Sequence, residues 1–135
     1  MSSINLQRYY WRQKKGAIFS TLQKIKLLKL KNLGCNKIRK PSRIEKSKIY
    51  GYKNNHKYNV VIMKVQKSVN KKKARKGKIF GKNKNHGTLK RKKNINLLSK
   101  ATSRTLKKFK SMKVMGVYWI NEDKQYRYYE IILVK

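Results

Sequence analysis

The charge of this chain is almost entirely of one sign. Its 135 residues include 39 lysines and arginines but only four aspartates and glutamates, which gives a formal net charge of +35. Charge of that size and single sign repels itself, so a compact free monomer is disfavoured until a polyanion neutralises part of it. Hydrophobic residues nevertheless make up 39% of the chain and gather in blocks, which argues against simple disorder. We therefore expect one small folded core with long basic segments that become ordered on an anionic partner.

Nucleic acid, an anionic membrane or an acidic protein could supply that negative charge. The longest apolar runs, such as "VMGVYWI" (residues 114–120), are far shorter than the roughly 18 residues of a membrane-spanning helix. The N-terminal "MSSINLQRYYWRQKK" lacks the apolar stretch and cleavage site of a signal peptide. The single cysteine, Cys35, excludes an intramolecular disulfide, and without an activating partner nearby we interpret it as an inert thiol.

The first part of the chain contains an amphipathic helical pattern. In residues 17–33, "AIFSTLQKIKLLKLKNL", apolar side chains recur at helical spacing with lysines between them, and Gly34 follows where a helix would end. A shorter helix around residues 4–11 is also expected. We expect the longer helix to face the core with its apolar stripe and a polyanion with its lysines; a membrane-surface helix is the alternative. The stripe consists of Ile18, Leu22, Ile25 and Leu28, broadened by Phe19 and Leu30.

Residues 36–57 show no clean periodicity and contain the only proline, Pro41, so we interpret them as an extended basic connector. Glu45 is expected to pair with a neighbouring cation or to cap a turn. Gly51, between two tyrosines, would allow close approach of the backbone to a partner.

The second part of the chain predicts a small α+β core. Residues 58–66, "YNVVIMKVQ", are rich in valine and isoleucine and indicate a strand. Residues 67–94 are the most basic block, and a connection of that length is usually functional or disordered when free. RNA contact is the favoured interpretation, and a solvated run of charge or a nuclear-import signal is the alternative. Residues 95–109 return to helical spacing, with Asn94 as the expected N-cap.

Two more strands, residues 111–120 and 125–134, are predicted to form an antiparallel hairpin across "NEDK". The expected architecture is a β-α-β-β antiparallel core in residues 58–135, with the long basic loop 67–94. Residues 1–57 would form an N-terminal helical and extended basic arm.

Three of the four acids, Glu122, Asp123 and Glu130, lie close together near the C-terminus, so an active site must be weighed against a folded hairpin. Adjacent Glu122 and Asp123 do not ensure two facing carboxylates, and neighbouring lysines would remove the raised pKa that a general acid needs. A turn at "NED" with Glu130 paired to a lysine or arginine is the favoured interpretation. With His56 and His86 far apart and so few acids, we predict no enzyme, no metal and no cofactor.

Four segments resemble one protein family in the same order. "VYWINEDKQYRYYEIILVK" (residues 117–135) is similar to a characteristic segment of the e-type, eukaryotic and archaeal family of large-subunit ribosomal protein fifteen. "PSRIEKSKIYGYK" (residues 41–53) resembles its "R-P-D-K-A-R-x-L-G-Y-K", "KGKIFGK" (residues 76–82) its "K-G-x-x-Y-G-K", and the N-terminal "YYWRQKK" its "L-W-R-x-K". The chain departs from the family at "HGTLKRKK", where the family usually has "H-G-V-N-Q-L-K". Most members also continue into a basic C-terminal tail, so this chain is expected to be C-terminally shortened.

The resemblance implies a structural component of the large subunit of the cytoplasmic ribosome, assembled in the nucleolus, with the long loop penetrating ribosomal RNA (rRNA). Its implied partners are large-subunit rRNA and neighbouring large-subunit proteins, with no membrane and no homo-oligomer. A DNA-compacting or other general nucleic-acid-binding protein is the alternative, because it would share the charge. Trp11, Tyr50 and Tyr52 could stack on bases or pack in the core. The residues expected to contact rRNA, from the resemblance and from the density of basic charge, are Arg39, Lys40, Arg43, Lys46, Lys48, Gly51, Tyr52, Lys53, Lys71, Lys72, Lys73, Arg75, Lys76, Lys78, Lys82, His86, Lys90, Arg91 and Lys92.

Overall fold

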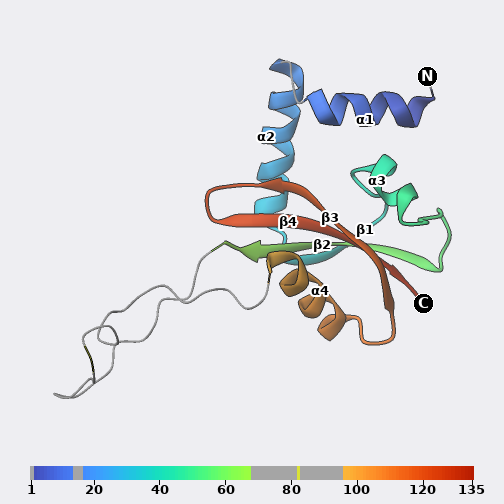
Figure 1. The fold of residues 1–135 in the computed structure, drawn as a ribbon, viewed down its shortest axis with the longest axis vertical. Coiled ribbons are helices and arrows are strands. Elements are labelled where there is room, and N and C mark those ends of the chain that lie inside the picture. Colours follow the sequence, from blue (N-terminus) through green and yellow to red (C-terminus); the bar gives the residue numbers. More distant parts are fainter. Residues whose placement is uncertain (1, 14–16, 68–81, 83–95) are drawn as a thin grey trace.

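The computed structural model is an α+β fold built on a four-stranded antiparallel sheet (Figure 1). It describes residues 2–13, 17–67, 82 and 96–135. The strands lie in the order β1-β2-β4-β3, with every neighbouring pair antiparallel. Helix α4 covers one face of the sheet, while α1, α2 and α3 lie on the other side. The elements in chain order are α1 (Ser3–Gln13), α2 (Ala17–Lys31), β1 (Cys35–Ile38), α3 (Ile44–Ile49), β2 (Tyr58–Gln66), α4 (Leu97–Lys108), β3 (Lys113–Glu122) and β4 (Tyr126–Val134).

Strand β2, one of the two central strands, is apolar on both faces because both faces are covered. Side chains alternate across a strand, so Val61, Met63 and Val65 pack on one side, against Ala101 of α4. Ile62 points to the other side and joins a separate cluster. That second cluster contains Leu30 of α2 together with Ile120 and Tyr128. The predicted strand at residues 58–66 is confirmed with the same bounds.

Helix α4 is confirmed, but its start differs from the prediction. Asn96 is the N-cap, and its side chain accepts a hydrogen bond from the backbone N–H of Leu98 at 2.6 Å. Asn94, the predicted cap, lies outside the described residues. Ala101 and Thr105 are the buried positions of the helix, one turn apart, and their small side chains let it pack closely on the sheet.

The interpretation of residues 36–57 as an extended connector is wrong in two places. Cys35–Ile38 forms the edge strand β1, in register from Cys35 opposite Met63 to Ile38 opposite Val60. Ile44–Ile49 forms the short helix α3. The sheet therefore has a fourth strand that comes from the N-terminal part of the chain. Four residues with two exposed polar side chains carry too little apolar pattern to indicate a strand without its partner.

Helix α2 is confirmed, but the prediction of its buried face holds only for Leu30, which broadened the predicted stripe, and is wrong for the four main residues of the stripe. The α2 residue buried against the sheet is Leu30, and Leu27 packs beside it in the same cluster. Asn121 of β3 fixes the middle of the helix, because its side-chain amide donates to Gln23 Oε1 at 3.1 Å. The predicted core stripe, Ile18, Leu22, Ile25 and Leu28, is exposed instead.

Candidate RNA-binding surface

A buried carboxylate attaches the segment before α3 to the sheet. Glu130 of β4 is fully buried, and the backbone N–H of Ser42 donates to both of its carboxylate oxygens, at 2.9 and 3.1 Å. A charge-assisted bond of this kind is stronger than a neutral one, and it satisfies a charge that would be costly to bury alone. The predicted lysine or arginine partner of Glu130 is therefore replaced by a backbone amide, and the segment around Pro41, itself buried, is held in place.

A second buried acid holds the start of α3. Glu45 is 1% exposed and accepts from Arg43 Nε at 2.8 Å, which confirms its predicted pairing with a neighbouring cation. The Arg43 guanidinium also lies 4.3 Å from the ring centre of Trp11 in α1 and reaches the carbonyl of Trp119 at 3.5 Å. Arg43, predicted to contact RNA, is thus engaged within the protein, and it joins α1, α3 and β3.

The same interface includes a lysine from α2. Lys26 Nζ lies 5.9 Å from the ring centre of Trp11, and burial lowers the pKa of Lys26, with the carboxylate of Glu130 acting in the opposite direction. Trp11 is further covered by Phe19, with ring centres 5.7 Å apart in an edge-to-face arrangement. Trp11 therefore packs against its own protein, one of the two alternatives that the sequence left open.

Two stacked tyrosines close the far end of α3. The rings of Tyr50 and Tyr118 are parallel to within 4°, with centres 6.1 Å apart. Gly116 leaves room for Tyr50, since a Cβ atom there would lie 2.3 Å from Tyr50 Cγ. Burial and the nearby carboxylate of Glu130 raise the pKa of Tyr118 far above its usual range, although its hydroxyl has no partner in hydrogen-bonding geometry. Gly51 then turns the chain with a φ of 75°, a value that favours glycine.

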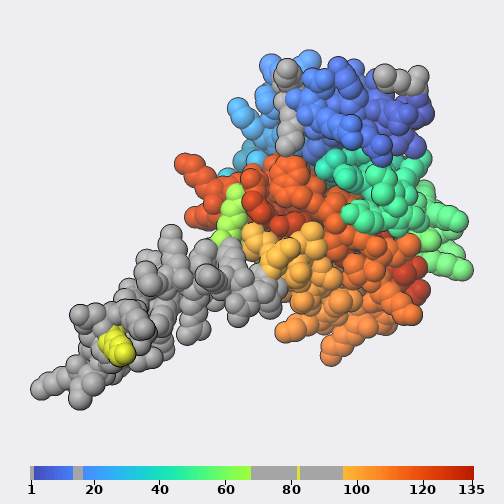
Figure 2. Space-filling model, viewed as in Figure 1, coloured from blue at the N-terminus to red at the C-terminus, as the bar shows by residue number. Residues whose placement is uncertain are grey.

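Beside these contacts lies a basic surface formed by residues 39–53, which we call the α3 surface. Its exposed members are Arg39, Lys40, Lys48 and Lys53, and Lys46 is half-buried. Figure 2 shows this part of the chain (teal) between the blue N-terminal helices and the orange and red strands. Tyr52 is half-buried and packs edge-to-face on Tyr58, so its ring is also engaged within the protein. The structure thus brings together the predicted site residues 39–53.

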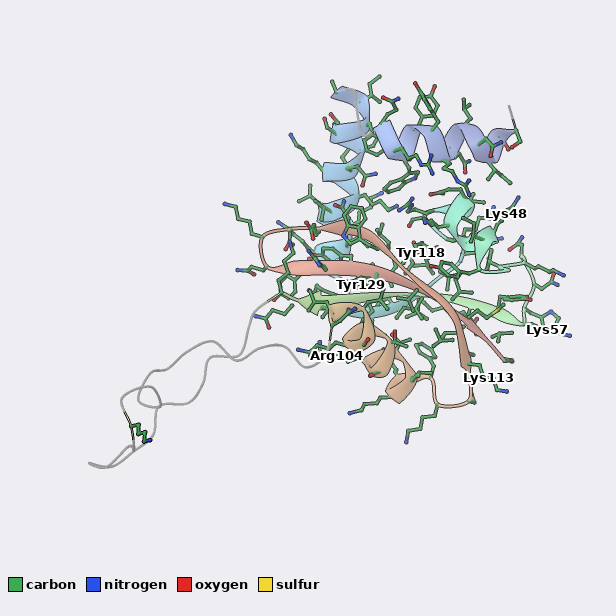
Figure 3. All side chains as sticks on the ribbon, viewed as in Figure 1. Lys48, Lys57, Arg104, Lys113, Tyr118 and Tyr129 are labelled. Atoms are coloured by element: carbon green, nitrogen blue, oxygen red, sulfur yellow. The ribbon has the colours of Figure 1, made fainter. Side chains whose placement is uncertain are left out.

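A further group of cations gathers at the same end of the sheet and was not predicted. Lys113 begins β3 opposite Val134, and Val134 also faces Tyr58, the residue after Lys57. The backbone N–H of Lys135 donates to the carbonyl of Lys57 at 3.1 Å, and all three lysines are exposed. Figure 3 shows Lys48, Lys57 and Lys113 toward one end of the sheet. No local motif marks these lysines, because only the strand register brings them together.

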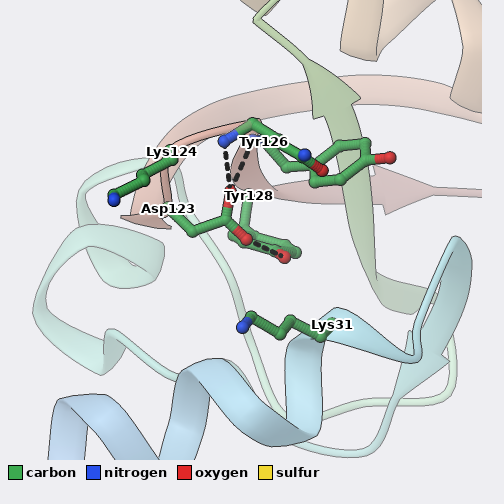
Figure 4. A pocket seen from close by; sticks show the side chains of 6 residues that line it. Lys31, Asp123, Lys124, Tyr126 and Tyr128 are labelled. Atoms are coloured by element: carbon green, nitrogen blue, oxygen red, sulfur yellow. Dashed lines mark hydrogen bonds between the residues drawn. The ribbon is translucent and has the colours of Figure 1, made fainter.

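The other two acids lie at the β3–β4 hairpin, which was predicted, but the predicted turn at "NED" is too long: Glu122 is the last residue of β3, opposite Arg127, and Asp123 is the one that lies in the turn. Asp123 Oδ1 accepts from the backbone N–H groups of Gln125 and Tyr126, at 2.8 and 2.6 Å, and Oδ2 accepts from the Tyr128 hydroxyl at 3.1 Å (Figure 4). Partial burial opposes ionisation, but these bonds and nearby Lys31 hold the pKa of Asp123 below its usual value. The open pocket beside it, about 560 Å³, is lined by Lys31, Asp123, Lys124, Gln125, Tyr126 and Tyr128.

Glu122, the last residue of β3, forms ion pairs with two cations. It accepts from Arg127 Nε at 2.6 Å and lies 3.2 Å from Lys67 Nζ. The hydrogen bond from Arg127 is the main reason that the pKa of Glu122 is lowered. A carboxylate with a lowered pKa is a poor proton donor near neutral pH, so neither hairpin acid suits general acid chemistry.

Among the predicted site residues in the long basic block, only Lys82 is described, and its side chain is exposed. In the described ranges no helix is long and apolar enough to cross a membrane. Within residues 2–13, 17–67, 82 and 96–135, no group of three or more His, Cys, Asp or Glu side chains could hold a metal ion. Burial raises the pKa of the half-buried thiol of Cys35, which lowers its reactivity. The predicted contacts outside the described residues are Lys71, Lys72, Lys73, Arg75, Lys76, Lys78, His86, Lys90, Arg91 and Lys92.

Comparison with known proteins relates nearly the whole chain to one family. Residues 2–135 match the family model described as Ribosomal L15, of the L15e type. The "Large ribosomal subunit protein eL15z" of Picea mariana is 35% identical over 125 residues, which cover 92% of this chain and 61% of that protein. The "Large ribosomal subunit protein eL15" of Dictyostelium discoideum is 32% identical over 130 residues, 96% of this chain and 63% of that protein. The chain thus spans somewhat less than two thirds of these relatives' length. The chain belongs to the Ribosomal L15 family of the L15e type.

Proposed function

We propose that this chain is a structural constituent of the large ribosomal subunit that binds and stabilises large-subunit rRNA. The observation that carries the proposal is the α3 surface, where exposed cations lie on a segment that the buried carboxylate of Glu130 attaches to the sheet and that the Glu45–Arg43 pair holds at the start of α3. The names of its relatives, which are large ribosomal subunit proteins, support the same role. Because the fold already holds the backbone that carries these cations, binding to phosphates orders only their exposed side chains and not the backbone as well.

The described part of the interface is proposed to be the exposed cations of the α3 surface, extended by Lys57, Lys113 and Lys135. Lysine neutralises phosphate as a point charge, and A-form RNA is recognised chiefly by its shape, its phosphates and its 2′-hydroxyl groups. Gly51 would allow close backbone approach, while Tyr52 and Arg43 would act by shaping the surface from within. The basic block 67–94, including Lys82, is proposed to extend the contact into the rRNA.

The proposed role involves no catalysis. All four carboxylates of the chain accept hydrogen bonds or ion pairs within the fold. We further propose that the chain acts as a single copy beside other large-subunit proteins. It would lie in the cytoplasmic ribosome after assembly in the nucleolus.

Sedimentation of a native lysate tests this assignment. In a sucrose gradient at about 0.5 M salt, the Debye length is roughly 4 Å and loosely held basic proteins are released. We expect the chain to remain with the large subunit. Release to the top of the gradient, or movement with DNA, would contradict the assignment and favour the DNA-compacting alternative.

Binding of the full chain to an rRNA fragment as a function of salt tests the α3 surface. Changing Lys48 and Lys53 to Gln should reduce the slope of log K against log salt by roughly 0.7–0.9 for each phosphate that is no longer neutralised. Changing Arg104 and Lys107 to Gln, which removes two exposed cations from α4, is the matched control. An equal reduction in both variants would show that total charge, rather than this surface, determines the binding.

A further inference from the structure

An exposed apolar stripe on α2 is not explained by RNA binding. Ile18, Leu22, Ile25 and Leu28 lie three or four residues apart and therefore line one side of the helix. Their exposed fractions are 79%, 59%, 46% and 63%. Single exposed apolar residues are ordinary on protein surfaces, but four aligned along three turns form a patch of the kind that marks an interaction site.

The stripe is distinct from the surface that holds α2 in the fold. Leu30 is the buried residue of the helix, and Leu27 and Gln23 also face the sheet. These residues lie roughly opposite Ile18 and Ile25 on a helix of 3.6 residues per turn. The helix is consequently apolar on two sides, and only one of them is used by the described core.

The charge around the stripe limits what could cover it. The first acid of the whole chain is Glu45, so neither α1 nor α2 contains a carboxylate. Lys24 and Lys29 on α2 are exposed beside or within the stripe. A second copy of the chain would bring the same positive charge against these lysines, whereas an acidic partner would complement them.

The apolar side chains favour a protein partner over RNA. Aliphatic surface gains free energy when it leaves water against another apolar surface. The accessible face of an RNA helix instead presents phosphates and hydroxyl groups, which would pair with the lysines but leave the aliphatic chains unmatched. An amphipathic protein helix supplies both an apolar face and flanking charges.

We propose that the α2 stripe is a docking surface for an amphipathic helix of another protein, with an apolar face flanked by acidic residues. The helix would lie along Ile18, Leu22, Ile25 and Leu28, and its carboxylates would pair with the neighbouring lysines. This contact goes beyond the proposed function, because it uses a face of the molecule whose apolar residues do not belong to the α3 surface.

The full chain can be tested with a synthetic helical peptide that has a leucine face flanked by glutamates. A peptide of the same composition in scrambled order keeps the charge but loses the apolar face. We expect the ordered peptide to bind at least about tenfold more tightly than the scrambled one. Changing Leu22 and Leu28 to Gln should abolish that difference, since glutamine is also a good helix former and both sites are exposed.

Changing the exposed Ile49 of α3 to Gln is the matched control and should leave peptide binding unchanged. RNA affinity and circular dichroism of each variant, together with binding to phosphatidylserine-containing vesicles, complete the test. Equal binding of ordered and scrambled peptides would overturn the proposal in favour of charge alone. Loss of RNA affinity in the Leu22 and Leu28 variant would reassign the stripe to the RNA interface, and loss of vesicle binding without a change in peptide binding would reassign it to a membrane surface. Neither of the last two results would alter the test of the α3 surface.

Discussion

Two buried acids act here as attachment points rather than as chemical groups. Glu130 of β4 accepts from the backbone N–H of Ser42 and so joins the residues before α3 to the sheet. Glu45 accepts from Arg43, two residues before it, and so holds the guanidinium that contacts Trp11 and the carbonyl of Trp119. In a chain with a net charge of +35, an exposed carboxylate would lower the attraction to a polyanion. Because these two carboxylates are buried, they form hydrogen bonds that hold the fold and do not lower the positive charge at the surface.

Glycine at position 116 is required by the tyrosine stack on the same interface. Gly116→Ala would place a Cβ atom 2.3 Å from Tyr50 Cγ, so Tyr50 must move away from Tyr118. Overpacking of this kind costs about 1–3 kcal/mol, and we expect that loss in the free energy of unfolding measured with urea. The contact involves the first ring atoms of Tyr50, which cannot swing away as the tip of a flexible chain would.

Two further variants make this prediction specific. Gly34→Ala, with nothing within 4 Å of the added Cβ, should change the free energy of unfolding by no more than about 0.5 kcal/mol. In a Tyr50→Ala background the cost of Gly116→Ala should fall by at least about 1 kcal/mol. An undiminished cost in that background would place the cause in the backbone of β3 rather than in the ring.

At the scale of elements, the local sequence pattern predicts a helix or strand that carries its own apolar periodicity. It does not predict a feature that depends on contact with another element. The strands β2, β3 and β4 and the helices α2 and α4 follow from apolar periodicity that lies within each segment. Strand β1 was missed because Cys35–Ile38 becomes a strand only through pairing with β2. The buried side of α2 was predicted correctly only at Leu30, because the helix has two apolar sides and the sequence does not say which one meets the sheet.

The candidate site also contains residues whose exposure the sequence predicted and residues whose role depends on contacts made only in the fold. Exposure of Lys48 and Lys53 agrees with a basic surface read from composition and family resemblance. Arg43 looks the same in the sequence, but Trp11 and Glu45 meet it only after folding, and it becomes an internal link. The grouping of Lys57 with Lys113 depends on strand register, which no local motif encodes.

The β3–β4 hairpin should weaken in acid. Folding lowers the pKa of Glu122 and of Asp123 from ordinary values of 4.5 and 3.8. A carboxylate whose pKa is lowered on folding adds stability that is fully present above its unfolded pKa and is lost as pH falls through the folded pKa. At constant ionic strength, the melting temperature should therefore fall as the pH drops from about 5 to about 3.

The variant Glu122→Gln measures how much of the acid-induced loss of stability is due to Glu122 alone. The Glu122 side chain is 39% exposed and screened by solvent, so its share is expected to be at most about 1 kcal/mol. The variant should be less stable than the parent at neutral pH and should show a smaller fall in melting temperature in acid. Lys124→Gln, a change in the same turn that removes no acid, should keep the full fall, and an identical fall in Glu122→Gln would contradict the assignment.

At the scale of the whole molecule, structure and charge act against each other. The sheet and its two covering layers bury an apolar core on both sides of β2 and β4. The net charge of +35 opposes that compact state because the cations repel one another over the whole surface. The four acids offset this repulsion only near α3 and in the β3–β4 hairpin. Most of the repulsion therefore remains, and an external polyanion would remove it.

Salt should therefore stabilise the free protein. Raising sodium chloride from about 0.01 M to about 0.15 M shortens the Debye length from about 30 Å to about 8 Å, which screens repulsion between distant cations. The buried contacts of Glu45 and Glu130 are screened much less, so the balance shifts toward the folded state. We expect the melting temperature to rise by at least about 4 °C, which corresponds to roughly 1 kcal/mol in a domain of this size.

Changing the exposed Lys107 and Lys110 to Gln should make the rise smaller. A melting temperature that falls with added salt would mean that the few ion pairs outweigh the repulsion, and the fold would then need no polyanion to be stable.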